Sequence, residues 1–295
     1  MAEPKPSPRK TLVALFVAVL AISFAAIFFR KAAPTHPLIA AGTRLMIASL
    51  LLIPWTILRW KKGLISGRVL RAGMVAGCWY ALHFGAWVTS LTLTTVAASV
   101  TLVTATPLLL ATVGLITGKD APSRGHWMGI GLGLVGLVVI GWADLSVSSD
   151  ALLGDGLAFI GAAAMAGYLL TCRHVADELE VWSFTGLATG VGALLLFLAA
   201  LGTGIPLEVP APEPLAYLVA AALIPQLVGH VLLTWSSRFL APVVVGTATL
   251  GEPVGSTVLA WLWLGEAPAL AIMAGCSVTL LGVFVALRST GLERD

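Results

Sequence analysis

The sequence predicts an all-α integral membrane protein with ten transmembrane helices, arranged as two inverted five-helix repeats. The first observation is composition: 58% of the 295 residues are hydrophobic and only 11% are charged, whereas soluble domains carry about 25% charged residues. The second is a series of long uncharged runs, each long enough to cross a bilayer as a helix. The third is an internal similarity at an offset of 146 residues. A chain of this length holds about ten spans of about 20 residues and no sizeable extramembrane domain.

Ten apolar runs define the expected spans, and their continuity favours helices over the alternating pattern of a β-barrel. The first run is too long for a signal peptide and has no small-residue cleavage site, so it is kept as a span. The third and fourth runs are fused, and a tight turn is expected at Thr92–Thr95. The runs are Thr11–Phe29, Leu38–Leu58, Ala72–Ser90, Thr95–Thr117, Trp127–Ala143, Leu157–Cys172, Ser183–Leu201, Leu215–Trp235, Pro242–Leu264 and Pro268–Leu287.

The distribution of Lys and Arg predicts the orientation of these spans. Of the 17 basic residues, Arg30 and Lys31 fall on one side and Arg44 within a span, so that fourteen remain for the other side. Because Lys and Arg accumulate in cytoplasmic loops, we expect residues 1–10 and 289–295 to be cytoplasmic tails of a protein of the cell (inner) membrane. The acidic connections Asp144–Asp155 and Glu208–Glu213 then face outward.

The internal similarity predicts a duplicated unit, residues 11–146 and 147–288. An offset of 146 residues pairs Pro107 with Pro253, and it also pairs Gly129 with Gly275 and Gly136 with Gly282. Two prolines and several glycines at one offset are harder to attribute to chance than apolar identities.

Each unit holds five spans, an odd number, so the second copy must enter the bilayer from the opposite side. The charges agree, because the connection with Lys119 and Arg124 is basic whereas its counterpart around Glu266 has no Lys or Arg. Inverted repeats are typical of alternating-access transporters, which bind substrate at mid-depth between the copies.

Several local patterns resemble the drug/metabolite transporter superfamily, specifically its ten-helix EamA-like members. They are Arg44-Leu45 with Pro54, Thr94-Thr95-Val96-Ala97-Ala98 leading to Thr106-Pro107-Leu108, Leu264-Gly265-Glu266, and the glycine-rich final helix of each repeat. One departure is Gly118-Lys119-Asp120, where a Gly-Glu pair is typical. The resemblance implies a secondary carrier, often an exporter of amino acids, metabolites or toxic small molecules, in which spans five and ten serve assembly.

Arg44 is the one basic residue expected inside a span, about six residues or 10 Å from its outer end. A charge at that depth is costly, so it should face protein or a water-filled cavity. There it can hold a substrate carboxylate through two parallel hydrogen bonds. The alternative is that the side chain reaches back to the interface or caps helix carbonyls.

Glu252 lies in the ninth expected span and precedes Pro253. An intramembrane acid of this kind is a candidate for proton coupling or for pairing with a cationic substrate. The alternative is a structural acid that stays neutral or pairs with an arginine. Pro107 and Pro253 interrupt the two equivalent helices, and we expect them to act as gates or hinges.

The third expected span carries Tyr80, His83 and Trp87 on one helical face, with Trp79 beside them. Such a stripe suits a flat or cationic ligand, although aromatic stripes also serve simple packing. The second copy offers a matching wall of Gln226, His230 and Trp235. Weaker candidates are Ser23, Thr101, Thr104 and Tyr168. The glycines of Gly129–Gly136 lie inside a span and are interpreted as helix packing, not as a nucleotide loop.

Taken together, these patterns predict a secondary active exporter of a small metabolite, amino acid or drug-like compound. It would work by alternating access around a mid-membrane cavity, with proton coupling through Glu252 as one option; the sequence identifies neither the substrate nor the coupling ion. The expected partners are the small-molecule substrate, protons and membrane lipid, with no nucleic acid, no cofactor and no metal, and no oligomeric state follows from the sequence. The alternatives are a passive facilitator or channel and, with less support, an intramembrane enzyme using His83, His230 and Glu252. ATP-driven pumping is disfavoured because no Walker-type loop is present.

Overall fold

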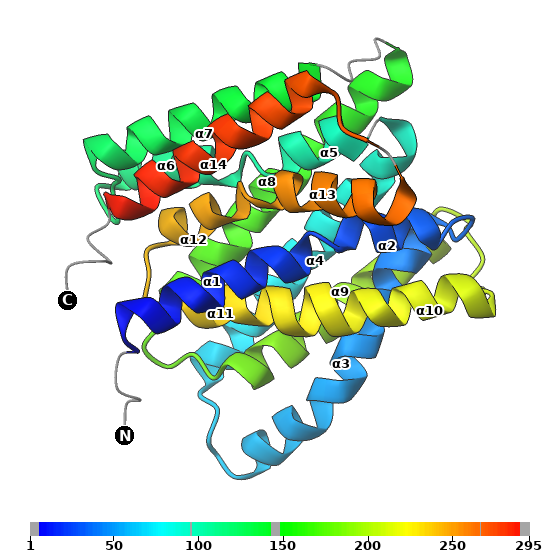
Figure 1. Cartoon of the computed structure of the whole chain (residues 1–295). Coiled ribbons are helices and arrows are strands. Elements are labelled where there is room, and N and C mark those ends of the chain that lie inside the picture. Colours follow the sequence, from blue (N-terminus) through cyan, green and yellow to red (C-terminus); the bar gives the residue numbers. More distant parts are fainter. Residues whose placement is uncertain (1–5, 95, 143–147, 266, 290–295) are drawn as a thin grey trace.

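The computed structural model describes residues 6–94, 96–142, 148–265 and 267–289, and these residues form helices with no β-strand among them. In Figure 1 the helices pack into one bundle, in which α1, α7, α11 and α14 lie nearly parallel and α3 crosses them at an angle. In chain order they are α1 (Pro8–Ile22), α2 (Ala25–Lys31), α3 (Pro37–Lys61), α4 (Gly67–Leu93), α5 (Val96–Val103), α6 (Thr106–Thr117), α7 (Arg124–Trp142), α8 (Ser149–His174), α9 (Val181–Gly202), α10 (Pro212–Ala221), the π-helix η1 (Ala222–His230), α11 (Val231–Ser236), α12 (Pro242–Thr249), α13 (Glu252–Leu264) and α14 (Leu270–Arg288).

Helix boundaries in the first half of the chain reappear 146 residues later. Both ends of α5 map onto the ends of α12, both ends of α7 map onto those of α14, and the start of α6 maps onto that of α13. The predicted turn also occurs where expected, since α4 ends at Leu93 and α5 begins at Val96; Thr95 itself lies outside the described residues. The chain is therefore built from two copies of one helical unit.

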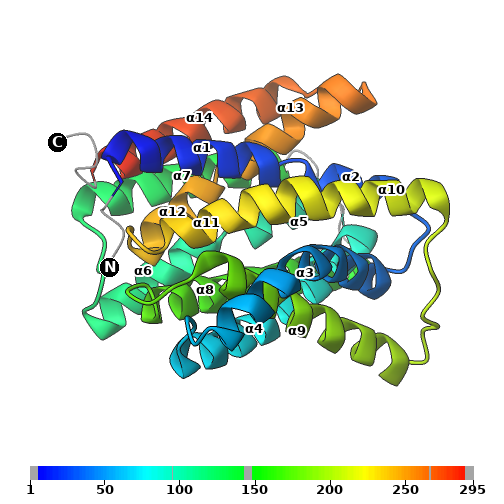
Figure 2. The ribbon, with the colours of Figure 1, turned by 90° about the horizontal axis from the view of Figure 1, so that it is seen from below.

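The two copies run in opposite directions. In Figure 1, α7 runs from left to right while its counterpart α14 runs from right to left beside it. Figure 2 shows the same pair side by side from below, with the start of α1 and the end of α14 at the same end of the molecule. This arrangement is the one expected when an odd number of spans is duplicated.

Glycines hold α7 and α14 together, as the sequence predicts. A Cβ added to Gly136 would lie 2.6 Å from the carbonyl oxygen of Gly275, and one added to Gly282 would lie 2.7 Å from that of Gly129. The 146-residue offset exchanges these two contacts, so the interface has the symmetry of the repeat. Small residues let two helix backbones approach this closely in a membrane.

Hydropathy and length support eight membrane spans among the described residues, fewer than the ten predicted. Of the two remaining expected spans, one is the shorter apolar segment Arg124–Ile140 of α7. The other is α4, which is long enough but is not among the eight. Its polar and aromatic side chains lower its hydropathy, and α4 packs against α3, α8 and α9 inside the bundle.

One predicted boundary is wrong. The acidic segment Asp144–Asp155 was expected to be a connection, but α8 already begins at Ser149 and contains Asp150 and Asp155. The Ser148 hydroxyl accepts a hydrogen bond from the Ala151 amide and caps the helix, and Asp150 lies in the first turn, where a negative charge is favourable. Residues 143–147 lie outside the described part of the chain.

Four of the expected spans are interrupted near their centres. α1 and α2 separate at residues 23–24, α5 and α6 at 104–105, and α12 and α13 at 250–251. The fourth interruption is η1, where Pro225 removes a backbone donor inside the helix. Pro107 and Pro253 are the second residues of α6 and α13, positions where a missing N–H leaves no bond unmade.

Candidate functional site

A small cavity lies where the interrupted helices meet. Its volume is about 30 Å³, enough for roughly two water molecules. Three pairs of its lining residues lie at three of the helix breaks: Ile22 and Ala25 flank the first, Thr104 and Thr106 lie in and after the second, and Thr249 and Glu252 flank the third. The cavity therefore touches each point at which α1/α2, α5/α6 and α12/α13 can change direction.

Thr106 and Glu252 occupy equivalent positions on the cavity wall. Each is the first residue of the second half-helix in its copy, α6 or α13. Peptide N–H groups at a helix start lack intrahelical partners and carry a partial positive charge. The cavity thus receives two symmetry-related helix starts, one of which bears a carboxyl group.

One face of α4 supplies an aromatic wall with a histidine in it. His83 stacks on Trp87 with ring centroids 6.0 Å apart, and both residues line the cavity. Nδ1 of His83 donates a hydrogen bond to the Gly161 carbonyl on α8 (2.8 Å), because a carbonyl can only accept. Nε2 of a neutral His83 is then left as an acceptor.

The two histidines predicted at similar depth do meet. The His83 and His230 ring centroids are 6.4 Å apart, and His230, the last residue of η1, also lines the cavity. Its ring packs edge-on against Phe84 at 5.3 Å. The wide turn of the π-helix, a form frequent at functional sites, places His230 and Gln226 on the side that faces the first copy.

Arg44 on α3 is completely buried against protein. Its Nη2 donates to Oε1 of Gln226 (2.9 Å), and its guanidinium carbon lies 4.4 Å from the centroid of Phe84. Nε and Nη1 have no hydrogen-bond partner among the described residues. Arg44 and Glu252 are close enough to interact electrostatically. A buried cation with two unused donor groups suits an anionic group of a ligand.

Tyr80 and Tyr168 join the two copies beside this arginine. Their rings stack at a centroid distance of 4.1 Å and an interplanar angle of 10°. The Thr234 hydroxyl donates to the His230 carbonyl (2.8 Å), so the Tyr168 hydroxyl must donate to Thr234 (2.6 Å). Tyr168 was only a weak candidate from the sequence, where it lies four residues before the end of its expected span.

Most of the residues predicted as a site converge around the cavity. His83, Trp87, His230 and Glu252 line it, and Tyr80 packs against the His230 ring. Arg44 and Gln226 do not line it: Arg44 bonds Gln226 and packs on Phe84, whose ring contacts His83 and His230 on the wall. Trp79 does not; it lies over Gly167 in a separate groove between α4 and α8. Trp235 packs instead against Phe239, with centroids 5.0 Å apart. Phe84 was not singled out from the sequence, because phenylalanine carries no polar signal.

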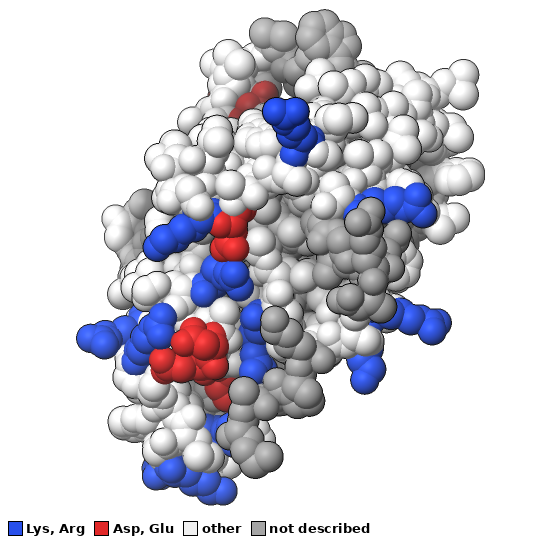
Figure 3. Space-filling model, turned by 90° about the vertical axis from the view of Figure 1, so that its left-hand side faces the viewer, with Lys and Arg blue, Asp and Glu red and all other residues white. Residues whose placement is uncertain are grey.

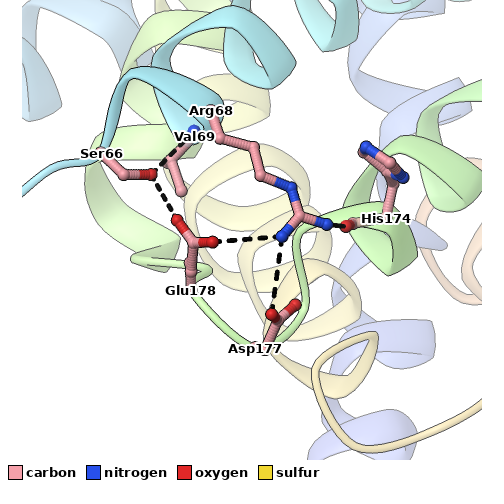
Figure 4. Close-up of polar contacts among 6 residues, drawn as sticks. All are labelled: Ser66, Arg68, Val69, His174, Asp177 and Glu178. Carbon is pink, nitrogen blue, oxygen red and sulfur yellow. Dashed lines mark hydrogen bonds and ion pairs between the residues drawn. The ribbon is translucent and has the colours of Figure 1, made fainter.

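A second polar cluster joins the copies at the end of the molecule where Lys and Arg side chains gather (Figure 3). Arg68, at the start of α4, pairs with Glu178 (3.1 Å) and Asp177 (3.5 Å) in the connection after α8, and it also donates to the His174 carbonyl (Figure 4). The Ser66 hydroxyl donates to Glu178 (2.5 Å). Hydrogen bonds from Ser66 and Arg68 lower the pKa of Glu178. We name Ser66, Arg68, Asp177 and Glu178 the end latch.

A further ion pair also joins the two copies. Nε and Nη2 of Arg173, at the end of α8, donate to the two carboxylate oxygens of Asp120, each at 3.0 Å. Asp120 belongs to the Gly118-Lys119-Asp120 departure noted in the sequence, so the departing residue has a structural partner. Neither the end latch nor the Arg173–Asp120 pair was predicted from the sequence. The only sequence feature that could have indicated them is the presence of a few acidic residues in otherwise basic connections.

The fold is shared with a solved crystal structure described only as "Crystal structure of protein". The two chains are 20% identical, the match covers 95% of this chain and 98% of the other, and the TM-score is 0.75. No curated protein matches the sequence. The model of the EamA-like transporter family matches twice, at residues 9–142 and 152–288, in agreement with the duplicated helices. The chain therefore belongs to the EamA-like transporter family, whose members are multi-pass membrane transporters of small substrates.

Proposed function

We propose that the protein is a secondary active exporter of a small metabolite, amino acid or drug-like compound, working by alternating access. The observation that carries the proposal is the position of the cavity, which is bordered by three helix breaks and walled by side chains of both copies. Opposite tilting of two inverted units about such breaks exposes one site to each side in turn.

The residues that line the cavity, together with Arg44 behind Phe84, suggest how a substrate is held. The unused Nε and Nη1 groups of Arg44 receive an anionic group, and His83 and Trp87 provide a flat surface for an apolar or aromatic part. Glu252, on the opposite copy, exchanges a proton or pairs with a cationic group. A volume of about 30 Å³ is smaller than a metabolite, so the helices must part at the breaks before a substrate fits.

We further propose that the basic end is cytoplasmic, following the distribution of Lys and Arg. The end latch and the Arg173–Asp120 ion pair then close the cytoplasmic side. Export requires the end latch and this ion pair to break once per transport cycle, because each of them joins one copy to the other. Their exposure keeps the cost of breaking small, since exposed ion pairs contribute at most about 1 kcal/mol each.

Counterflow in proteoliposomes tests this function. Vesicles are loaded in turn with unlabelled amino acids, nucleosides and organic cations, and uptake of a labelled trace of the same compound is followed with and without a pH gradient. A carrier accumulates label transiently above equilibrium, and the pH gradient changes the extent if protons are coupled. Equilibration without overshoot would instead identify a passive facilitator, and chemical conversion of the solute would identify an enzyme.

A further inference from the structure

A second, larger cavity lies on the outside of the bundle, between α4 and α8. Its volume is about 540 Å³. α4 begins and α8 ends at the basic end of the molecule, so the groove opens there and runs along both helices towards the membrane interior. None of its residues lines the central cavity, so it is a separate site, and its function does not follow from the transport cycle.

The groove changes from basic to apolar along its length. On α4, Arg71, Val75 and Trp79 follow one another at intervals of four residues and therefore share one face. On α8, which runs the opposite way, Leu170 and His174 do the same. The cationic and titratable groups consequently lie at the mouth, and the apolar groups lie deeper. From Arg71 to Trp79 the helix rises about 12 Å.

The floor of the groove is made by Trp79 lying on Gly167. A Cβ added to Gly167 would be 2.6 Å from the Trp79 ring, so a larger residue there would push the indole out of place. The ring is only partly buried, and Val75 beside it is exposed. Apolar side chains exposed on the outer face of a membrane-spanning bundle offer a surface to which acyl chains can bind.

The two arginines at the mouth of the groove differ in their partners. Arg68 is occupied by Glu178, Asp177 and the His174 carbonyl. Arg71, one turn further along α4, is exposed and forms no hydrogen bond or ion pair with the described residues. Because the two latch carboxylates neutralise Arg68 and would repel an anion beside it, an anionic ligand should settle on Arg71 and the exposed His174.

We propose that this groove binds an anionic phospholipid, with the phosphate headgroup at Arg71 and His174 and the first part of an acyl chain on Val75 and Trp79. Basic pockets between transmembrane helices bind anionic headgroups in this way. A free phosphate ion would use the mouth but not the apolar floor. The lipid spans α4 of the first copy and α8 of the second, next to the end latch, and therefore stabilises the closed seam at this end.

The test uses the full chain in vesicles of phosphatidylcholine containing spin-labelled phosphatidylglycerol or spin-labelled phosphatidylcholine. Electron paramagnetic resonance gives the relative association of each lipid with the protein. Removing one cation near a membrane surface costs about 1 kcal/mol, so we expect Arg71→Gln to reduce the preference for phosphatidylglycerol about fivefold. Arg71→Lys should retain most of it. Trp79→Ala should weaken the binding of both lipids.

Arg124→Gln is the matched control, because Arg124 is an exposed arginine at the same end that does not line the groove. Equal losses in Arg71→Gln and Arg124→Gln would overturn the proposal in favour of a general surface charge effect. So would a wild-type protein that shows no preference. Displacement of the lipid by millimolar inorganic phosphate would show that the mouth binds a free anion. The measurement needs no transport, so it can fail or succeed independently of the proposed export function.

Discussion

The rings of Tyr80 and Tyr168 lie face to face across the seam between the two copies, with centroids 4.1 Å apart. Both side chains are fully buried, and the Tyr168 hydroxyl continues the contact to Thr234. One stacked pair thus connects α4, α8 and α11 beside the cavity.

This contact predicts two different losses of stability. Tyr168→Phe keeps the stack and removes one hydrogen bond, while Thr234 retains its bond to the His230 carbonyl, so the free energy of unfolding should fall by about 1 kcal/mol. Tyr168→Ala removes the ring and should cost about 3–5 kcal/mol. Thermal unfolding of the purified variants in detergent measures both. Equal effects of the two variants would contradict a role for the stack.

Substitution of Arg44 tests the proposed anion-binding group. Arg44→Lys keeps the charge but cannot supply the planar set of donors that reaches Gln226 and a ligand together. Loss of a charge-assisted hydrogen bond costs about 1.5–3 kcal/mol, so the substrate concentration at half-maximal counterflow should rise about 10- to 100-fold. Gln226→Leu, which removes only the protein partner, should have a smaller effect. Unchanged binding in Arg44→Lys would show that the arginine is purely structural.

Glu252→Gln tests proton coupling. The amide preserves the size of the side chain at the start of α13 but cannot exchange a proton. We expect exchange of substrate for substrate to persist, while transport driven by an imposed pH gradient falls at least tenfold. Measuring both in the same proteoliposome preparation separates coupling from folding. A pH dependence identical to that of the wild type would remove Glu252 from the coupling step.

The end latch should weaken in acid. The pKa of Glu178 is lowered by hydrogen bonds from Ser66 and Arg68, so its stabilising contribution is fully present above the ordinary carboxyl pKa of about 4.3. It is lost as the pH falls through the lower value that Glu178 has in the latch. The difference in melting temperature between wild type and Glu178→Gln should therefore be constant at neutral pH and shrink below about pH 4. A difference that persists in acid would assign the effect to packing.

Two glycines on α7 provide a matched pair for the assembly interface. Gly136→Ala places a Cβ against the backbone of α14, whereas Gly131 has open space around it. We expect Gly136→Ala to lower the free energy of unfolding by about 1–3 kcal/mol and Gly131→Ala to leave it unchanged or raise it by up to about 1 kcal/mol. Thermal unfolding compares the two. Similar destabilisation by both would mean that α7 and α14 do not depend on close approach.

The helical class and the duplication could be predicted because each depends on a pattern that extends over many residues: the length of the apolar runs and the identities at one constant offset. An apolar run of about 20 residues is long enough to form a membrane-spanning helix. The offset that pairs Gly136 with Gly282 also pairs the glycines that each of them contacts, Gly275 and Gly129. The hydropathy signal fails for α4. One face of that helix is buried among protein, where polar and aromatic side chains such as His83 contact neighbouring residues rather than lipid.

The cavity was predictable to the extent that polar groups inside a membrane must face something polar. This reasoning located Arg44, His83 and Glu252, which are all buried. It did not distinguish Trp79, which lies in the groove between α4 and α8, because the face of a helix that meets the seam depends on rotation by a fraction of a turn. The sequence could not predict the end latch, because the pairing of Arg68 with Glu178 depends on how two connections far apart in the chain approach each other in the fold.

The π-turn at Pro225 has no counterpart in α4, which is continuous through the equivalent stretch. If the two halves were identical, a two-fold rotation would interconvert the forms open to either side, and the two forms would have equal energy. Here one half carries an irregular turn that the other lacks, so this symmetry is broken beside the cavity. The gradient alone still decides the direction of net flow, but a molecule with unequal halves need not load and unload its solute equally readily from the two sides.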